Sequence, residues 1–431
     1  MTRADTTLKF LLDLQFFGIK AGLDNIRALL FSLGNPERRF PSIHLAGTNG
    51  KGSTSAMIAS ILTASGYRTG LYTSPHLVDF EERIRIDGKK IPREEVIQYT
   101  DRMKPEIRKN RATFFEATTA MAFQYFAESK VDIAVVETGL GGRWDATNVI
   151  RPELSVITNI GLDHTEYLGR TLSRIAFEKG GIIKPGVPFV TGVDQRGPLG
   201  VLRRLARIRG AELITAGGNS SVSVAGRSLT LTRLNLRTPG GRYDGLAVGL
   251  AGDHQARNAQ LAVLAAEELG RKESFRQISR DSIVGGLESI RKNTGLHGRL
   301  DLIRTDPMLI ADVAHNPDGT ATLTRALKAL GAGEYVTLFG VMRDKNYRAM
   351  MEALAPHSRL AIGVRPHGGR ALETETIVEG FQSAGCRALN GGTVKSGLDL
   401  ALRERREGEP ILVTGSHYVV GELLKSLNFA V

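Results

Sequence analysis

A glycine-rich segment near residue 50 carries the residue types that bind phosphate. Residues 43–53 read IHLAGTNGKGS, so an apolar run leads into glycines, one lysine and several hydroxyl side chains. Glycines let backbone N–H groups converge on an anion, a following helix presents its positive end, and the lysine adds a point charge. We therefore expect a nucleotide phosphate site made of Thr48, Asn49, Gly50, Lys51, Gly52 and Ser53, with the Ser53 hydroxyl within reach of a magnesium ion.

This loop departs from the usual P-loop pattern, which has a glycine five residues before the Gly-Lys pair and Ser or Thr directly after the lysine. Here Leu45 takes the first place and Gly52 follows Lys51. A glycine-rich turn can also exist only because a tight turn needs positive φ. The lysine and the neighbouring hydroxyls favour the nucleotide site over that alternative.

A second candidate is a carboxylate at the end of a predicted strand. Glu137 is followed by Gly139, Gly141 and Gly142, which leave backbone room around it. The cation that accompanies ATP prefers oxygen ligands, so Glu137 is a candidate metal ligand. A buried glutamate could instead cap a neighbouring helix, because it is rarely buried without a partner. On the residues alone, Lys179 is only a cation favoured by the dipole at a helix end.

The elements that must position these groups follow from the apolar pattern. Short runs rich in Val, Ile and Leu alternate with helical patterns, which predicts a doubly wound sheet with helices on both faces. The expected parallel strands are 43–46, 70–73, 133–137 and 155–159, and the expected helices are 53–64 and 117–127. Ligands of such sheets bind at the carboxyl ends of the strands, where Ser74, Glu137 and Asn159 stand.

The second half of the chain predicts two further units. Alternating polar and apolar residues at 221–252, interrupted by Pro-Gly-Gly, predict a small antiparallel appendage. Helices are expected at 254–269 and 280–292, followed by a linker at 293–298. Strands at 309–313, 336–339, 360–363 and 411–414 then alternate with helices and predict a smaller, Rossmann-like α/β domain. We therefore divide the chain into residues 1–295, an ATP-binding P-loop domain, and residues 296–431.

Composition excludes several classes of protein. A chain of 431 residues with 42% hydrophobic content can bury more than one core. The single cysteine, Cys386, excludes an intramolecular disulfide, and no signal-like or membrane-length apolar run is present, so we expect a cytoplasmic protein. The net charge is +12, but the basic residues are scattered along amphipathic segments. We expect anionic small-molecule substrates, no nucleic-acid or membrane partner, and a monomer.

Seven motifs stand in the same order as in one enzyme family. They are GTNGKGS at 47–53, TSPHL at 73–77, ERIR at 82–85, ETGLGGRWDATN at 137–148, NIGLDH at 159–164, EKGGI at 178–182 and DVAHNP at 312–317. With this set, nearly the whole chain resembles folylpolyglutamate synthase and dihydrofolate synthase, which belong to the Mur ligase superfamily. The resemblance implies that the two domains form an ATP-dependent ligase. Such a ligase joins L-glutamate to a pteroate or folate carboxylate through an acyl phosphate.

The resemblance also assigns roles near the phosphates. Ser74, Glu137 and His164 match the residues that hold magnesium, with two metal sites in the family. Lys179 matches a lysine that is often carbamylated, although Gly180 stands where the family usually has alanine. Lys51, Lys179 and His164 are thus the expected catalytic residues. On the ATP side the family match adds Asn258 for the adenine, Arg299 for phosphate, Asp312 for the ribose and His315 for the base.

The acid and amino-acid substrates receive further residues from the same resemblance. Positions that line the family's pteroate pocket are matched by Phe115, Glu116, Trp144, Asp145 and Ala146, with Ile19 in a segment near it. Lys345 is expected to face the amino-acid substrate. Trp144 stands where the family commonly has leucine, and His297 where it usually has proline, which we expect to loosen the linker. An aromatic pair such as 114–115 is more often core than ligand pocket.

Two other functions are considered. One is a Mur-type ligase for a peptidoglycan precursor, which the TSPHL and GLGGRWDATN motifs do not favour. The other is a P-loop binding switch, which would carry an Asn-Lys-x-Asp motif for guanine, and none is present. We therefore expect a ligase that uses ATP and Mg²⁺ and acts as a dihydrofolate synthase, a folylpolyglutamate synthase, or both.

Overall fold

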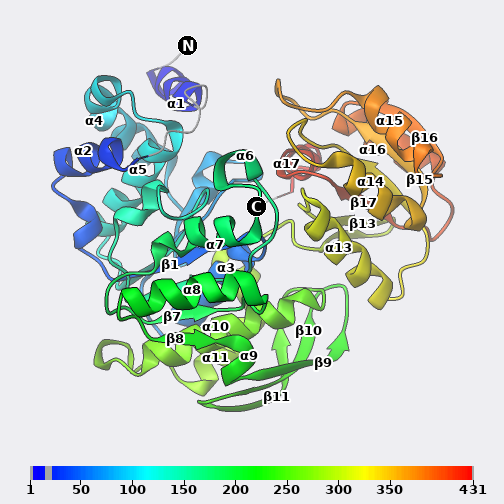
Figure 1. Ribbon diagram of the computed structural model, residues 1–431. Helices are drawn as coiled ribbons and strands as arrows, with labels where there is room; N and C mark the ends of the chain where they lie inside the picture. The colour runs from blue at the N-terminus through cyan, green and yellow to red at the C-terminus, as the bar shows by residue number, and fades with distance from the viewer. Residues whose placement is uncertain (1–2, 15–21, 430–431) are drawn as a thin grey trace.

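The computed structural model describes residues 3–14 and 22–429 (Figure 1). Their strands form sheets of eight, three and six strands. The large sheet and the three-stranded sheet lie on one side of the molecule in Figure 1, and the six-stranded sheet lies on the other. Within the described ranges, none of the helices combines the length and the apolar character needed to cross a lipid bilayer.

The eight-stranded sheet has the order β4-β3-β2-β5-β1-β6-β7-β8. Neighbouring strands pair in parallel along the series β2, β5, β1, β6, β7 and β8. Strands β3 and β4 form an antiparallel hairpin, and β3 pairs antiparallel with β2 at one edge of the sheet. The bounds are β1 (Ser42–Ala46), β2 (Thr69–Tyr72), β3 (Ile84–Ile86), β4 (Lys89–Lys90), β5 (Ile133–Glu137), β6 (Leu154–Ile157), β7 (Phe189–Thr191) and β8 (Leu213–Thr215). The central strand β1 is buried along its whole length, as its apolar sequence predicts.

Helices cover both faces of this sheet because successive strand residues point to opposite faces. In β5, Val135 joins a core with Met57 of α3, while Val136 joins a core with Phe123 of α5. The first face is covered by α3 (Lys51–Ala64), α10 (His254–Gly270), α11 (Arg280–Glu288) and α12 (Ile290–Thr294). The second face is covered by α2 (Asp24–Ser32), α4 (Arg93–Asn110) and α5 (Phe114–Glu128), with α1 (Arg3–Asp13) beside them.

The remaining helices of this part flank β6 to β8 or form short turns. They are α6 (Thr165–Leu168), α7 (Leu172–Lys179), α8 (Arg196–Ile208), α9 (Ala216–Asn219), and the 3-10 helices η2 (Pro36–Arg38), η3 (Phe80–Arg83), η4 (Ala146–Val149), η5 (Gly180–Ile182) and η6 (Glu273–Phe275). The antiparallel appendage consists of β9 (Ser221–Arg227), β10 (Thr232–Thr238) and β11 (Gly241–Val248), with β10 central. Alternate residues of β10, including Leu234 and Leu236, are buried against α10.

The six-stranded sheet has the order β12-β13-β17-β14-β15-β16 and is parallel except for β12. Its strands are β12 (Asp301–Thr305), β13 (Met308–Ala311), β14 (Tyr335–Phe339), β15 (Ser358–Val364), β16 (Ala388–Gly392) and β17 (Ile411–Thr414). Its helices are α13 (Pro317–Ala329), α14 (Tyr347–Leu354), η7 (Ala355–His357), α15 (Thr374–Ser383), α16 (Val394–Glu404) and α17 (His417–Ser426). Apolar clusters on both faces of this sheet confirm the predicted α/β fold class.

Two details of the sequence prediction were wrong. The helix expected at 280–292 is two helices, α11 and α12, which meet at Ser289. The linker expected at 293–298 therefore begins inside α12, which continues to Thr294 and ends with Gly295 at φ +62°. The division of the chain at residue 295 stays a prediction.

The predicted linker contains a histidine with several side-chain contacts. His297 Nδ1 lies 2.8 Å from an Asp301 carboxylate oxygen, and its ring meets the Phe429 ring edge-on at 5.3 Å. The other Asp301 oxygen pairs with Arg291 at 3.1 Å. The imidazole has partners that a proline could not have, and the effect of this departure on the linker stays a prediction.

Candidate active site

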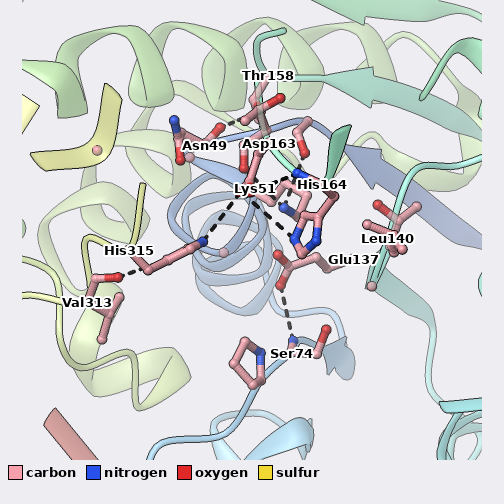
Figure 2. Close-up of a pocket in the computed structure, with 18 of the residues that line it drawn as sticks. Asn49, Lys51, Ser74, Glu137, Leu140, Thr158, Asp163, His164, Val313 and His315 are labelled. Atoms are coloured by element: carbon pink, nitrogen blue, oxygen red, sulfur yellow. Dashed lines mark hydrogen bonds and ion pairs between the residues drawn. The ribbon is translucent and has the colours of Figure 1, made fainter. Parts of the chain in front are cut away.

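One cavity of about 1980 Å³ collects the predicted site residues from both halves of the chain (Figure 2). Every predicted site residue that the structure describes lines this cavity; Ile19 lies outside the described residues. The lining includes Thr48, Asn49, Gly50, Lys51, Gly52, Ser53, Ser74, Phe115, Glu116, Glu137, Trp144, Asp145, Ala146, His164, Lys179, Asn258, Arg299, Asp312, His315 and Lys345. The carboxyl ends of β1, β2, β5 and β6 all reach it, as expected for a doubly wound sheet.

The loop between β1 and α3 can only be built with glycines at two positions. A Cβ atom on Gly47 would lie 1.9 Å from Thr158 Oγ1, and one on Gly50 would lie 2.5 Å from Asn258 Oδ1. Gly50 also has φ +80°, which favours glycine. Lys51 Nζ donates to the carbonyl oxygens of Gly47 at 3.1 Å and Thr48 at 3.3 Å, so the lysine side chain folds back over the loop.

The end of β6 fixes this loop from the side. The side-chain oxygen of Asn159 accepts the backbone N–H groups of Thr48 at 3.2 Å and Asn49 at 2.8 Å. Thr158 Oγ1 donates to the Asn49 carbonyl oxygen at 2.7 Å. The loop therefore keeps its shape through hydrogen bonds to a neighbouring strand, which is the preorganisation that a phosphate site needs.

Glu137 is a buried carboxylate among cations at the end of β5. Its side chain is 3% exposed, and Oε2 accepts the backbone N–H of Ser74 at 3.3 Å. Arg299 reaches the same place, because its Nη2 lies 3.2 Å from where a Gly52 Cβ would stand, and Glu137 Oε2 lies 3.8 Å from that point. Burial raises the pKa of Glu137, while Lys51 and Arg299 act to lower it.

The residues predicted to hold magnesium fit such a role. No group of three His, Cys, Asp or Glu side chains forms a metal cage in the part of the chain that the structure describes. Magnesium does not need one, because it is usually held by one or two carboxylates together with phosphates and water. Burial lowers the pKa of His164 to about 4, so its imidazole is neutral and able to act as a ligand near neutral pH. Ser74, Glu137 and His164 remain the predicted ligand set.

Lys179 lies under the phosphate loop. It is the last residue of α7, is 5% exposed, and donates from Nζ to the Gly47 carbonyl oxygen at 2.7 Å. Burial, together with nearby Lys51, lowers its pKa to about 7. A buried lysine with such a pKa is partly neutral at physiological pH, which its ordinary value would not allow. The neutral amine is the form that can react with carbon dioxide.

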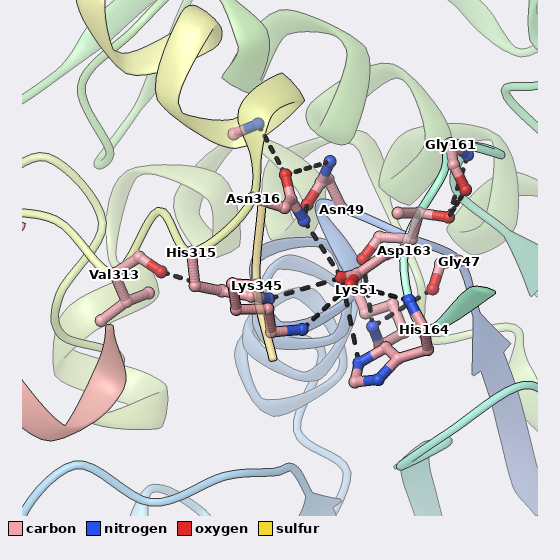
Figure 3. A network of polar contacts seen from close by, with 12 residues as sticks. Gly47, Asn49, Lys51, Gly161, Asp163, His164, Val313, His315, Asn316 and Lys345 are labelled. Atoms are coloured by element: carbon pink, nitrogen blue, oxygen red, sulfur yellow. Dashed lines mark hydrogen bonds and ion pairs between the residues drawn. The ribbon is translucent and has the colours of Figure 1, made fainter. Parts of the chain in front are cut away.

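A network around Asp163 joins the two halves of the molecule (Figure 3). Its carboxylate accepts from Lys345 Nζ at 2.9 Å and from Asn316 Nδ2 at 3.2 Å, and His315 Nε2 lies 3.7 Å away. Burial alone would raise the pKa of Asp163, but His315, His164 and Lys345 hold it well below its usual range. Of these partners, Lys345 and His315 line the cavity, and Asn316 Nδ2 also donates to Asn49 Oδ1 of the phosphate loop at 3.0 Å.

Asp312, predicted to bind the ribose, has its carboxylate engaged by backbone groups. The Leu300 N–H and the Ala314 N–H each donate to it at 2.8 Å. Asp312 therefore fixes the segment that carries Arg299. The predicted adenine residue Asn258 donates to Gln255 Oε1 at 2.9 Å, and His315 Nδ1 lies 3.0 Å from the Val313 carbonyl oxygen. The nucleotide contacts of these residues stay predictions.

The other end of the cavity has the aromatic wall expected for a flat ring. The Phe115 ring lies against Gly139, where a Cβ would approach to 2.6 Å, and Trp144 keeps 54% of its surface exposed. The two acidic residues of this wall cap local turns. Glu116 Oε2 accepts the Thr113 N–H at 2.7 Å, and Asp145 accepts the Leu140 N–H at 2.8 Å. Direct substrate contacts of Glu116 and Asp145 stay predictions.

Several cavity residues were not singled out as site residues from the sequence. They include Asp163, beside the predicted ligand His164; His76, inside the TSPHL motif; and Arg83, inside the ERIR motif. Membership of a motif was the only signal available for them. Which partner each side chain meets depends on the packing of distant segments, and no local pattern shows that.

Comparison with known proteins shows two matching family models. The Mur ligase middle domain matches residues 45–266, and the Mur ligase glutamate ligase domain matches residues 298–417. Among curated relatives, the dihydrofolate synthase/folylpolyglutamate synthase of Bacillus subtilis is 40% identical over 432 residues, covering 96% of each chain. The folylpolyglutamate synthase of Lacticaseibacillus casei is 35% identical and covers 93% of each chain.

Solved structures give the same result. Mycobacterium tuberculosis folylpolyglutamate synthase complexed with ADP superimposes with a TM-score of 0.89 at 31% identity, covering 98% of each chain. Escherichia coli FolC in complex with DHPP and ADP has a TM-score of 0.86 at 28% identity, covering 98% of this chain and 97% of that one. The similarity therefore extends over both halves of the molecule and the cavity between them.

Proposed function

Because this chain belongs to the Mur ligase family, in its folylpolyglutamate synthase and dihydrofolate synthase branch, we propose that it joins glutamate to a pteroate or folate carboxylate with ATP. The observation that carries this proposal is the set of residues that line the large cavity. A phosphate loop with Lys51, the buried Glu137 and Lys179, and an aromatic wall with Phe115 and Trp144 all line it. The relatives named above support the same reaction, and two of their structures contain ADP.

The reaction has two steps. An oxygen of the substrate carboxylate attacks the γ-phosphorus of ATP, the bond to the β-phosphate oxygen breaks, and ADP leaves an acyl phosphate behind. The amino group of glutamate then attacks the acyl carbon, a proton leaves the nitrogen, and phosphate departs as the amide forms. No protein nucleophile is needed, so the chain has to position the reactants and compensate their charge.

The residues of the loop and of Arg299 supply that compensation. The N–H groups at the start of α3 and the Lys51 ammonium face the place where transferring phosphate carries charge. Arg299 adds a guanidinium from the second half, above Gly52. Magnesium, held by Ser74, Glu137 and His164, would add further positive charge when bound. Lys345, which lines the cavity from the second half and contacts Asp163, would face the incoming amino acid, and His315 would pack on the base of ATP.

We propose that both acids are substrates of this one chain, since the name of the Bacillus subtilis relative carries both activities. The test is ADP release by purified protein with ATP, magnesium, glutamate and either dihydropteroate or tetrahydrofolate. Omitting the acid, the glutamate or the magnesium should remove ADP release, and Lys51→Ala should abolish it while the fold is kept. Equal ADP release without any pterin acid would refute the ligase assignment. The remaining functions would then be a nucleotide hydrolase or a P-loop switch.

A further inference from the structure

Arg83 is a buried arginine that faces the cavity without a carboxylate partner. It is the last residue of η3, is 7% exposed and lines the cavity. Among the residues that the structure describes, no Asp or Glu forms an ion pair with it; Nε donates to His76 Nδ1 at 2.8 Å. Arginine is rarely buried unless it is paired, and here Glu82 and Glu137 act on the guanidinium without forming an ion pair with it, so a contacting anion would complete its surroundings.

The nearest carboxylate in sequence is committed elsewhere. Glu82 accepts the backbone N–H groups of Leu77 at 2.8 Å, Val78 at 2.9 Å and Asp79 at 2.6 Å. These three bonds occupy both Glu82 oxygens in ordering the loop that carries Ser74. Glu82 therefore does not serve as the ion-pair partner of Arg83.

The guanidinium of Arg83 is held in a fixed orientation. Burial lowers the pKa of His76 to about 3, so its neutral ring can accept the Nε–H bond. On one side the guanidinium lies over the Phe114 ring, with its carbon 5.1 Å from the ring centre. The N–H groups at Nη1 and Nη2 have no protein acceptor in the described residues. A fixed planar fork with free N–H groups is the arrangement that binds a carboxylate.

The reacting carboxylate has a different place. It must reach the γ-phosphate, and the predicted phosphate site consists of the loop and Lys51, with Arg299 and Glu137 beside Gly52. Arg83 is tied to His76 and Phe114 on the aromatic side of the cavity. A pteroate has a single carboxylate and uses it in the reaction. A folate ends in a glutamyl residue with two carboxylates, and one of them remains free.

We propose that Arg83 binds the non-reacting carboxylate of the terminal glutamyl residue of a folate substrate. Arg83 is then a specificity residue that supports the folylpolyglutamate synthase reaction and is dispensable for pteroate. This inference rests on the proposed function and deepens it. The structure assigns the chemical class of the ligand group, a carboxylate, and the step it serves, the recognition of an already glutamylated acid.

Binding provides the first test, with Trp144 as the probe. It is the only tryptophan of the chain and lines the same cavity, so its fluorescence reports ligand binding. The ligands are folate and pteroate, which differ only in the glutamyl residue, added to the full-length protein without ATP. Arg83→Gln should weaken folate binding about 10- to 100-fold, the range for loss of a charge-assisted contact, and pteroate binding by less than about threefold.

Turnover provides the second test. Arg83→Gln should lower kcat/KM for tetrahydrofolate by a similar factor while dihydropteroate turnover stays near the wild-type value, and this retained activity shows that the variant is folded. Arg83→Lys keeps the positive charge but lacks the planar pair of N–H groups. Its kcat/KM for tetrahydrofolate should therefore lie between the values of the wild type and of Arg83→Gln. The matched control is Arg85→Gln, because Arg85 is also buried without a carboxylate ion pair, donates to the Gly88 carbonyl at 2.9 Å, and does not line the cavity.

The outcomes separate the inference from the proposed function. Equal losses on both acids would overturn the inference, because Arg83 would then hold the reacting carboxylate or only support the fold. An unchanged preference for folate over pteroate would overturn it as well. A failure of the proposed function would show earlier, as no ADP release by the wild-type chain with either acid.

Discussion

The side-chain nitrogen of Lys179 donates a hydrogen bond to the carbonyl oxygen of Gly47 at 2.7 Å. The contact joins the end of α7 to the first glycine of the phosphate loop. The backbone of the same lysine packs on the loop that bears Trp144, since a Cβ on Gly142 would lie 2.7 Å from the Lys179 carbonyl oxygen. A single buried residue therefore touches both the nucleotide side and the acid side of the cavity.

We predict that Lys179 is carbamylated. Its pKa of about 7 leaves a neutral amine at physiological pH, and carbamylation would place a carboxylate near the predicted metal ligands. The carbamate nitrogen keeps one N–H, so the bond to Gly47 can remain. Protein supplied with ¹³C-bicarbonate should show a carbamate signal by NMR that Lys179→Ala lacks. Lys184→Ala is the matched control, because Lys184 is a half-buried lysine with a pKa lowered to about 8 but lies outside the cavity.

The same pKa sets a pH dependence. Below pH 7 the amine is protonated and cannot form the carbamate, so activity should rise as the pH increases from about 6 to 8. Between pH 7 and the ordinary lysine value of 10.5, the unfolded chain binds a proton that the folded chain does not. The contribution of Lys179 to the free energy of unfolding therefore increases with pH across this window. A fully active enzyme without any carbamate signal would contradict the prediction.

We predict that Arg299 is needed for ATP use although it lies outside the phosphate loop. Its Nη2 stands over the start of α3, 3.2 Å from the Cβ position of Gly52. Arg299→Ala should raise the KM for ATP at least about tenfold, as expected for loss of a charge-assisted contact to phosphate. Arg343→Ala, an exposed arginine paired with Glu373, should leave this KM unchanged. An unaltered ATP dependence in Arg299→Ala would show that the two halves do not share the nucleotide.

Much of the cavity could be predicted because its chemistry lies at strand ends within motifs. The expected strand at 133–137 coincides with β5, which places Glu137 at its end, and the strand at 411–414 coincides with β17. Buried parallel strands give continuous apolar runs that are easy to recognise. Strand β16 (Ala388–Gly392) was missed, since it is an edge strand with the sequence ALNGG, in which only Ala388 and Gly391 are buried.

The partners of polar side chains could not be predicted in the same way. The Asp145 carboxylate accepts the Leu140 and Thr147 N–H groups, and Glu116 caps the start of α5. From the sequence, both carboxylates were predicted to bind the substrate, and these local contacts were not foreseen. The contacts of Glu116 and Asp145 are local, and the spacing of Thr113 and Glu116 is that of a capping box. In the sequence, Arg83 was recognised only as a member of the ERIR motif. The structure shows that its guanidinium forms no ion pair with an acidic residue in the described part of the chain. The stacking of Arg83 on Phe114 joins segments that are distant in sequence, and no local pattern shows it.

We predict that the Leu205 side chain occupies the space left by the missing side chain of Gly180. The family usually has alanine where Gly180 stands, and a Cβ there would lie 2.5 Å from Leu205 Cδ1 and 3.1 Å from Leu202 Cδ2. Gly180→Ala should lower the free energy of unfolding by about 1 kcal/mol through overpacking, and Leu205→Ala by about 2–4 kcal/mol through a cavity. In urea unfolding, the double variant should lose less than the sum by at least about 0.5 kcal/mol. Strict additivity would show that the two sites do not compete for space.

Trp144 is predicted to hold the pterin ring of both acids, in contrast to the selective role of Arg83. Its loop is fixed, because Asp145 caps η4 and the neighbouring Arg143 lies over the Phe177 ring at 3.9 Å. The indole itself is 54% exposed at the cavity wall, so one face of its ring is available for stacking on a ligand.

Trp144→Leu should therefore raise the KM for dihydropteroate and tetrahydrofolate by the same factor. Loss of stacking costs about 0.5–1.5 kcal/mol, or roughly two- to tenfold. Phe31→Leu is the matched control, since Phe31 is an exposed aromatic residue outside the cavity. A lower KM in Trp144→Leu would mean that the indole obstructs the pocket, and a change on one acid only would place it beside the glutamyl residue instead of the pterin.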